Sequence, residues 1–254
     1  WLEIADRCWC GGRSDTPSPH SAHYHVCARC GAHFANRRLK PDCIGKFYSY
    51  EGYWQQRQQS KQHPTLWERQ QLLEADGRVE HWIKAIERHT GAARGTAVEV
   101  GCAEGTLLLH LRKLGWQTVG IEPDAETASG VHSRTGLDVR AGVFPEVAAP
   151  VCDLFIACDV LEHVPDPLAF LRAARTALRP GGILFLQLPL LEKAQPDFGH
   201  MTDKVFDPQE HVFIYSREAL ATLLETAEFE VLENNDAWRR AHEIVIARRI
   251  ERPV

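Results

Sequence analysis

The chain has 254 residues, of which 44% are hydrophobic and 25% are charged, and its formal net charge is −5. This composition is too apolar for a disordered chain, and the length suits one large domain with a small additional module. The negative charge weighs against nucleic acid as the main partner, because phosphate contacts need clustered Lys and Arg side chains. Neither an apolar run near the ~20 residues that span a bilayer nor a secretory signal is visible. We therefore expect a cytoplasmic protein with no membrane partner.

Residues 1–45 come first and differ from the rest of the chain. They are rich in Cys, His, Gly, Ser and Pro and have no long helical period. Such a segment buries little apolar surface, so it needs a disulfide or a bound metal to fold. Two close cysteine pairs, Cys8 with Cys10 and Cys27 with Cys30, are each followed by a glycine. Four thiolates suit a tetrahedral, structural Zn²⁺ site, and we predict a zinc-binding module here. Two alternatives remain open: free thiols or a disulfide, and replacement of one cysteine by a nearby histidine, namely His20, His23, His25 or His33.

An aromatic linker and a helical segment are expected over residues 46–94. Aromatic side chains gather at residues 47–54 and a polar stretch follows. Pro64 is placed to start a helix. Apolar residues then recur at helical spacing over residues 66–89, with a weak point at Gly77.

Strands and helices alternate over residues 95–254, which predicts a single α/β domain. The alternation favours a doubly wound, mostly parallel sheet. Helices are expected after the first strand, after Asp124 as N-cap, before the Pro180-Gly181-Gly182 turn and after Ser216 as N-cap. The expected strands are residues 96–100, 118–121, 137–141, 154–158, 183–188, 229–232 and 243–247.

A glycine loop joins the first of these strands to its helix. Gly101 and Gly105 allow a sharp turn and close approach of a ligand to the backbone. Glu122 ends the next strand about 20 residues later, where a carboxylate can bind both hydroxyls of a ribose. The glycine spacing differs from the G-x-G-x-x-G of dinucleotide loops, and Glu99 before the loop suits a cationic ligand better than a pyrophosphate. The loop therefore predicts a nucleoside site, with a simple turn as the alternative.

Four ordered motifs carry a resemblance to a known family, the class I S-adenosylmethionine (SAM)-dependent methyltransferases. The run Val-Glu-Val-Gly-Cys-Ala-Glu-Gly at residues 98–105 resembles their motif I. Residues 120–124 resemble the ribose-binding motif, residues 152–167 the fourth-strand motif, and residues 178–182 the turn into the fifth strand. The resemblance covers roughly residues 95–250 and implies a Rossmann-like fold with a seven-stranded sheet. One departure is Ala103, where many members carry Gly.

The resemblance also implies the cofactor contacts. Gly142, Val143 and Phe144 correspond to positions near the adenine, and Asp159 and Val160 to positions near the methionine end. The implied SAM-binding set is Glu99, Gly101, Cys102, Ala103, Gly105, Glu122, Pro123, Gly142, Val143, Phe144, Asp159 and Val160. Residues 1–45 and the aromatic residues after them are similar to the zinc-ribbon-like leader of a subset of these enzymes, which includes sugar C-methyltransferases.

Three histidines are candidates for catalysis. Methyl transfer from a sulfonium is an in-line displacement with a neutral leaving group, so proximity and orientation supply most of the acceleration. A base is needed only where the acceptor must lose a proton. We favour His211, with His163 and His200 as further candidates; His200 and His211 lie in a long loop over residues 189–211. For His163 and His211 the alternative is a histidine that only stabilises its loop by hydrogen bonding.

The sequence thus predicts a methyltransferase acting on O, N or C of a small molecule, such as a sugar or a natural-product intermediate. Two alternatives stay open: a zinc-containing RNA methyltransferase, and a non-catalytic SAM-binding partner protein. A basic surface and salt-dependent binding would mark the first. Tight SAM binding without turnover would mark the second. The sequence gives no indication of the oligomeric state.

Overall fold

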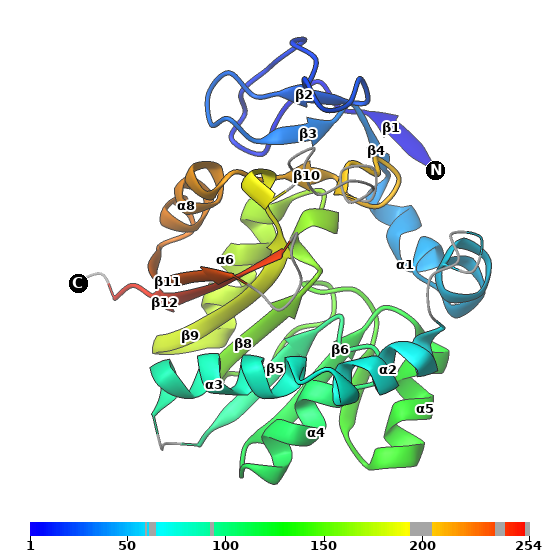
Figure 1. Ribbon diagram of the computed structural model, residues 1–254, viewed down its shortest axis with the longest axis vertical. Helices are drawn as coiled ribbons and strands as arrows, with labels where there is room; N and C mark the ends of the chain where they lie inside the picture. Colours follow the sequence, from blue (N-terminus) through cyan, green and yellow to red (C-terminus); the bar gives the residue numbers. More distant parts are fainter. Residues whose placement is uncertain (59, 61–64, 92–93, 194–204, 237–241, 252–254) are drawn as a thin grey trace. The chain divides into compact units, whose positions relative to one another are not determined.

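The computed structural model describes residues 1–58, 60, 65–91, 94–193, 205–236 and 242–251 (Figure 1). The chain divides into two compact units. Unit 1 comprises Trp1–Pro41, Asp159–Arg175 and Leu186–Val254, and unit 2 comprises Asp42–Cys158 and Thr176–Phe185. Among the described residues, no helix is both long enough and apolar enough to pass through a bilayer.

The main sheet has seven strands in the order β11-β12-β9-β8-β5-β6-β7. Strand β5 pairs in parallel with β6 and β8, β6 pairs in parallel with β7, and β11 pairs with β12 in antiparallel fashion. The predicted doubly wound, mostly parallel seven-stranded sheet is therefore confirmed. The strands are β5 Thr96–Val100, β6 Gln117–Glu122, β7 Asp138–Ala141, β8 Cys152–Cys158, β9 Leu178–Pro189, β11 Phe229–Asp236 and β12 His242–Arg249.

Buried apolar runs explain the centre of unit 2. Ala97, Val98 and the stretch Leu154–Ala157 are completely buried, as expected of parallel strands covered on both faces. Helix α4, Thr106–Lys113, buries Leu107, Leu108 and Leu111. Helix α5, Ala125–Thr135, begins at the predicted N-cap, where the Asp124 side chain accepts a hydrogen bond of 2.7 Å from the backbone N–H of Thr127.

The segment before β5 contains two helices where one was predicted. Helix α2 covers Leu66–Ala75 and helix α3 covers Arg78–Thr90. Gly77 separates them because it adopts a left-handed backbone conformation (φ 76°) that would interrupt a continuous helix. A capping box between Thr65 and Glu68 starts α2, and Pro64 lies outside the described residues. The sequence did not predict α1, Ile44–Phe47, or the π-helix η2, Tyr50–Gln58.

Strand β9 differs from its prediction at its start. It begins at Leu178, directly after helix α6, Pro167–Ala177. The expected Pro180-Gly181-Gly182 turn therefore lies inside the strand, where the left-handed Gly181 (φ 73°) bends the backbone.

Short strands build the N-terminal part of unit 1. Strand β1, Leu2–Ile4, pairs with β4, Arg37–Leu39. Strands β2, Tyr24–Val26, and β3, His33–Ala35, form an antiparallel sheet with β10, Phe213–Ile214, in the order β10-β3-β2. The remaining elements are η1 Pro41–Cys43, η3 Leu161–His163, η4 Leu191–Lys193 and α8 Arg217–Thr226, whose N-cap is the predicted Ser216.

Candidate functional site

The glycine loop of unit 2 folds back onto the end of β6. Gly101 (φ 68°), Ala103 (φ 46°) and Gly105 (φ 69°) all have left-handed backbone conformations. A Cβ atom at Gly105 would lie 2.7 Å from Cδ1 of Leu137, so a side chain there would displace Leu137, and the left-handed backbone itself favours glycine. Alanine tolerates its conformation at some cost in strain, which is how the chain accommodates a residue other than glycine at position 103.

Two buried carboxylates flank this loop. Glu99 on β5 and Glu122 at the end of β6 are 6% and 5% exposed. Glu122 accepts a hydrogen bond of 2.9 Å from the backbone N–H of Ala103 and one of 3.3 Å from that of Asp124, so the neighbouring Pro123 lies within the same turn. Oε2 of Glu99 is buried and has no hydrogen-bond partner among the described residues.

Burial shifts the proton affinity of both acids. It raises the pKa of Glu99 to about 8, and the charge of Glu122 adds to this shift. Burial also raises the pKa of Glu122 to about 7, although the backbone hydrogen bonds from Ala103 and Asp124 oppose it. Two such carboxylates are stabilised by a positive charge and by hydroxyl donors. The pair of carboxylate acceptors therefore fits a cationic nucleoside such as SAM.

The adenine-side residues of the prediction lie beside the same strand end. Gly142 (φ 133°) donates its backbone N–H to the carbonyl oxygen of Glu122 at 2.9 Å. A Cβ atom there would lie 2.4 Å from Val147. Phe144, two residues on past Val143, is 6% exposed and packs against the ring of Phe155 with centroids 5.2 Å apart.

Cys102 differs from the other loop residues. Its side chain is 5% exposed and belongs to a core cluster with Leu108, Val131 and Leu137. Only its backbone is therefore in a position to contact a ligand. The sulfur fills the space that the glycine at position 120 leaves open, since a Cβ atom on Gly120 would lie 2.6 Å from it.

Unit 1 contains the other predicted residues. Asp159 (φ 55°) donates its backbone N–H to the carbonyl oxygen of Gln187 at 2.8 Å. Its carboxylate accepts a hydrogen bond of 3.0 Å from the Gln187 side chain and lies 3.4 Å from Nε2 of His242. Val160 is the N-cap residue of η3. Gln187 lies in a predicted strand and His242 lies next to one, but their sequence pattern does not mark either as a site residue.

His163 and His211 form a buried pair. Their ring centroids lie 4.8 Å apart with an interplanar angle of 64°. Nδ1 of His163 lies 2.8 Å from the carbonyl oxygen of Glu210, and Nδ1 of His211 lies 2.6 Å from that of Val205. Because a carbonyl oxygen only accepts, we assign the proton of each neutral ring to Nδ1, which leaves Nε2 as a hydrogen-bond acceptor.

Electrostatics keep this pair neutral. Burial lowers the pKa of His163 to about 4, and burial also lowers the pKa of His211. Both rings are therefore uncharged bases at neutral pH. His200 lies outside the described residues.

Glu162 joins the histidine pair and was not predicted as a site residue. It is 1% exposed, and its Oε1 lies 3.9 Å from Nε2 of His163. Its Oε2 is buried without a hydrogen-bond partner among the described residues, and burial raises its pKa. A carboxylate oxygen of Glu162 and one ring nitrogen from each of His163 and His211 lie within 4.8 Å of one another, so the three side chains form a buried polar cluster. The signal available in the sequence was an acid next to His163, just after a buried strand.

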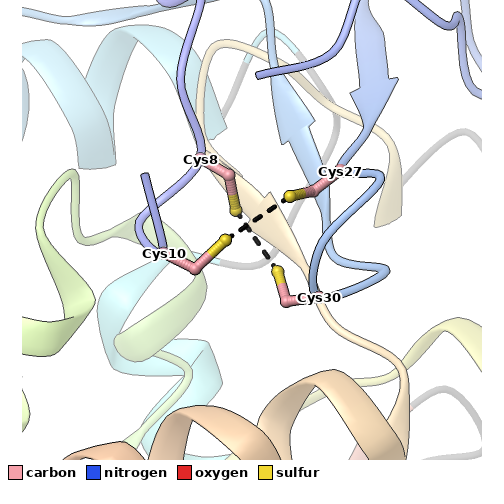
Figure 2. Close-up of side chains that lie close together, drawn as sticks. All are labelled: Cys8, Cys10, Cys27 and Cys30. Carbon is pink, nitrogen blue, oxygen red and sulfur yellow. Dashed lines mark hydrogen bonds between the residues drawn. The ribbon is translucent and has the colours of Figure 1, made fainter. Parts of the chain in front are cut away.

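The four predicted cysteines meet in unit 1 (Figure 2). Sγ of Cys8 lies 3.5 Å from that of Cys30, and Sγ of Cys10 lies 3.5 Å from that of Cys27. No disulfide joins them. Tetrahedral Zn²⁺ with Zn–S bonds of about 2.3 Å needs sulfur atoms about 3.8 Å apart, so the cluster fits this ion closely. His33, one of the alternative ligands, instead has Nδ1 2.9 Å from the hydroxyl of Ser18.

The chain is similar to known proteins in sequence and in fold. The family model described as "Methyltransferase domain" matches residues 66–234, more than half of the chain. Ubiquinone biosynthesis O-methyltransferase of Xanthomonas campestris pv. campestris is 37% identical over 97 residues, which cover 35% of this chain and 41% of that protein. The chain thus spans less than half the length of the curated relatives it matches.

Two solved structures share the fold at low identity. Magnesium protoporphyrin IX methyltransferase from Synechocystis PCC 6803, solved with bound SAH, has a TM-score of 0.62 and 11% identity, covering 83% of this chain and 100% of that chain. Human N-acetylserotonin methyltransferase, solved in complex with SAM, has a TM-score of 0.59 and 16% identity, covering 72% of this chain and 54% of that chain. At these identities the similarity shows the fold alone.

Proposed function

We propose that this chain, which belongs to the methyltransferase domain family, transfers the methyl group of SAM to an oxygen, nitrogen or carbon atom of a small molecule. The family match and the fold identify a SAM-dependent methyltransferase domain. The observation that carries the proposal is the buried pair Glu99 and Glu122 beside the glycine loop, with an unpartnered oxygen on Glu99. Burial of two acids is costly unless a ligand supplies charge and donors.

The cofactor site uses the residues of the loop and of both strand ends. Glu122 binds the ribose hydroxyls, and Glu99 binds the ammonium group of the methionine moiety directly or through water. The backbone of the loop from Gly101 to Gly105 approaches the cofactor, and Gly142, Val143 and Phe144 contact the adenine. Asp159 and Val160 contact the methionine end. Bound SAM supplies a methyl group activated on a sulfonium.

The acceptor side uses the neutral histidine pair. Nε2 of His211 takes the proton of the acceptor's hydroxyl or amine as that atom attacks the methyl carbon, and His163 orients the acceptor. The lowered pKa of both rings leaves them unprotonated at neutral pH, so the lone pair on Nε2 of His211 is free to accept a proton. His200 remains a third candidate for this role.

The small-molecule class and the oxygen acceptor rest on different observations. The net charge of −5 and the buried polar group at Glu162, His163 and His211 suit a small neutral acceptor better than an RNA phosphate backbone. The curated relatives are named as O-methyltransferases, which favours oxygen over nitrogen or carbon. Ubiquinone-type phenols, sugars and natural-product alcohols are therefore the first acceptors to test.

The proposal also includes a structural Zn²⁺ ion bound by the N-terminal module. The four thiols of Cys8, Cys10, Cys27 and Cys30 would hold it with no open position, so the ion would be structural and would coordinate neither the cofactor nor the acceptor. Bound zinc replaces the apolar core that a segment of this size cannot build.

Calorimetric titration with SAM and with its demethylated product, SAH, tests the central claim. We expect both to bind in the micromolar range at one site per chain. Turnover is then followed as SAH release with a panel of phenols, sugars and short RNAs. If neither SAM nor SAH binds, the proposal is contradicted. If only the RNAs are methylated, the acceptor is RNA and not a small molecule. Tight binding of SAM with no turnover of any acceptor favours the non-catalytic partner protein.

A further inference from the structure

The four-cysteine cluster is built into a hairpin. Cys27 follows β2 directly, and Cys30 lies three residues before β3, so the second cysteine pair forms the turn between these strands. The backbone N–H of Cys27 donates to the carbonyl oxygen of Ala32 at 2.9 Å, and that of Gly31 donates to Cys27 at 2.9 Å. A metal held by this turn therefore fixes the start of β3.

The hairpin continues into the acceptor-side residues. Strand β3 pairs with β10, with Phe34 opposite Phe213 and His33 opposite Ile214. The backbone N–H of Ala35 donates to the carbonyl oxygen of Val212 at 2.8 Å. The backbone N–H of Val212 in turn donates to the carbonyl oxygen of Glu162 at 2.7 Å.

Tyr24 makes the most direct of these contacts. It stands on β2, is completely buried, and donates its hydroxyl to the backbone carbonyl oxygen of His211 at 2.7 Å. Its ring packs edge-on against Phe206 with centroids 5.3 Å apart, in a core cluster that also contains Val205. The backbone carbonyl oxygen of Val205 accepts the hydrogen bond from Nδ1 of His211. Tyr24 thus bonds to the backbone of His211 and packs in the same cluster as Val205, whose carbonyl oxygen holds the His211 ring.

We propose that the hairpin clamped by the four cysteines positions His211 for methyl transfer, with Tyr24 as the positioning residue. The inference rests on the proposed role of His211 and assigns the N-terminal module a part in the reaction beyond stabilising the fold. Occupancy or oxidation of the cysteine cluster then alters the acceptor side through a continuous set of hydrogen bonds. SAM binding by Glu99 and Glu122 uses none of these contacts.

The hydroxyl of Tyr24 is suited to this task. Burial raises the pKa of Tyr24, so the hydroxyl stays protonated and remains a donor throughout the physiological pH range. Tyr215 offers a matched control in the same unit. It is also completely buried, but its hydroxyl has no hydrogen-bond partner among the described residues. Removing it should cost little.

The test compares Tyr24→Phe with Tyr215→Phe in the full, metal-containing chain. In Tyr24→Phe we expect amide hydrogen exchange over residues 205–214 to rise by roughly twofold to tenfold, the range that one lost hydrogen bond gives. The ring ¹⁵N resonances of His211 should move as well. Tyr215→Phe should leave both unchanged, and the SAM dissociation constant should stay within about twofold of the parent in both variants.

Removal of the metal by a chelator is the second arm. Exchange over residues 24–35 and over residues 205–214 should rise together, while SAM still binds. The inference is overturned if Tyr24→Phe leaves exchange over 205–214 and the His211 resonances unchanged, or if chelation exposes the hairpin without affecting 205–214. Failure of SAM to bind the parent protein contradicts the proposed function instead, and the exchange measurements remain interpretable without it. Where an acceptor is turned over, Tyr24→Phe should lower kcat and leave the KM for SAM unchanged.

Discussion

The backbone N–H of Ala103 donates a hydrogen bond of 2.9 Å to Oε2 of Glu122. This contact joins the glycine loop to the end of the neighbouring strand and holds the carboxylate in one orientation. The second oxygen of Glu122 accepts from the backbone of Asp124 at the start of α5. An acid fixed from both sides in this way is preorganised for a bidentate ligand such as the two hydroxyls of a ribose.

Glu122→Gln should weaken SAM binding. The amide keeps the size of the side chain but removes its charge, and charge-assisted hydrogen bonds are worth about 1.5–3 kcal/mol, so we expect a loss of roughly tenfold to a hundredfold in affinity. Calorimetry measures it. Glu126→Gln, at an exposed acid in the first turn of the neighbouring helix α5, is the matched control and should bind SAM like the parent. Equal affinity in Glu122→Gln would remove the acid from the cofactor site.

SAM binding should release protons and become tighter as the pH rises from about 6 to about 7.5, below the pKa of about 7.7–8.0 at which an α-ammonium group such as that of the ligand loses its own proton. In the free protein the pKa values of Glu99 and Glu122 are about 8 and about 7, so both acids are partly protonated near neutrality. A cationic ligand favours the ionised acids, so protons leave on binding. Calorimetry in buffers of different ionisation enthalpy counts these protons. A proton count of zero at pH 7 would contradict the expectation.

The same two acids set a pH dependence of stability without ligand. Their pKa values are raised in the folded state above 4.5, so between 4.5 and about 8 the folded chain holds more protons than the unfolded chain. The contribution of these two acids to the free energy of unfolding therefore falls as the pH rises through this range and levels off above it. Burial lowers the pKa of His33 and His163 to about 4 and also lowers that of His211, so these histidines oppose the trend below about pH 7, where their unfolded forms still bind protons. Denaturant titrations at about pH 7 and 8.5 therefore measure the contribution of the two acids, and Glu99→Gln should flatten the slope.

The sequence predicts those parts of the molecule that repeat a local pattern. Alternating strands and helices predict the seven-stranded sheet, and the spacing of Gly101, Gly105 and Glu122 predicts a loop facing an acid. Gly77 was recognised as a weak point, but its left-handed conformation, which splits the helix in two, depends on packing that periodicity does not report. Cys102 belongs to a motif by position, yet its side chain fills the core beside Gly120.

Contacts between distant segments are the part that the sequence does not predict. Strand β10 has two residues, too few for a recognisable alternation, and it exists because β3 pairs with it from about 180 positions away. The hydrogen bond from Tyr24 to His211 and the approach of Glu162 to His163 have the same origin. Cysteine spacing predicts that two pairs meet, whereas the diagonal neighbours Cys8 with Cys30 and Cys10 with Cys27 come from the fold.

Cys10→Ser should remove the bound metal and destabilise the chain. Loss of one of four thiolates weakens Zn²⁺ binding strongly, and folding in such modules depends on the ion. If the free energy of unfolding falls by about 3 kcal/mol, the midpoint of thermal unfolding falls by roughly 6–12 °C. Elemental analysis should give about one zinc per chain in the parent and much less in the variant. Cys43→Ser, at a cysteine outside the cluster, is the control and should retain the metal.

His211→Asn should slow methyl transfer without affecting SAM binding. The Asn amide can still donate to the carbonyl oxygen of Val205, as Nδ1 of His211 does, but it offers no basic nitrogen in place of Nε2. General base catalysis contributes about 10²–10⁴-fold, so kcat should fall within that range while the SAM dissociation constant stays unchanged. Single-turnover rates and calorimetry measure the two quantities. His23→Asn, at an exposed histidine of the N-terminal module, controls for the substitution itself. If kcat for His211→Asn equals that of the parent, His211 only stabilises its loop, and the acceptor loses its proton to another group or has none to lose.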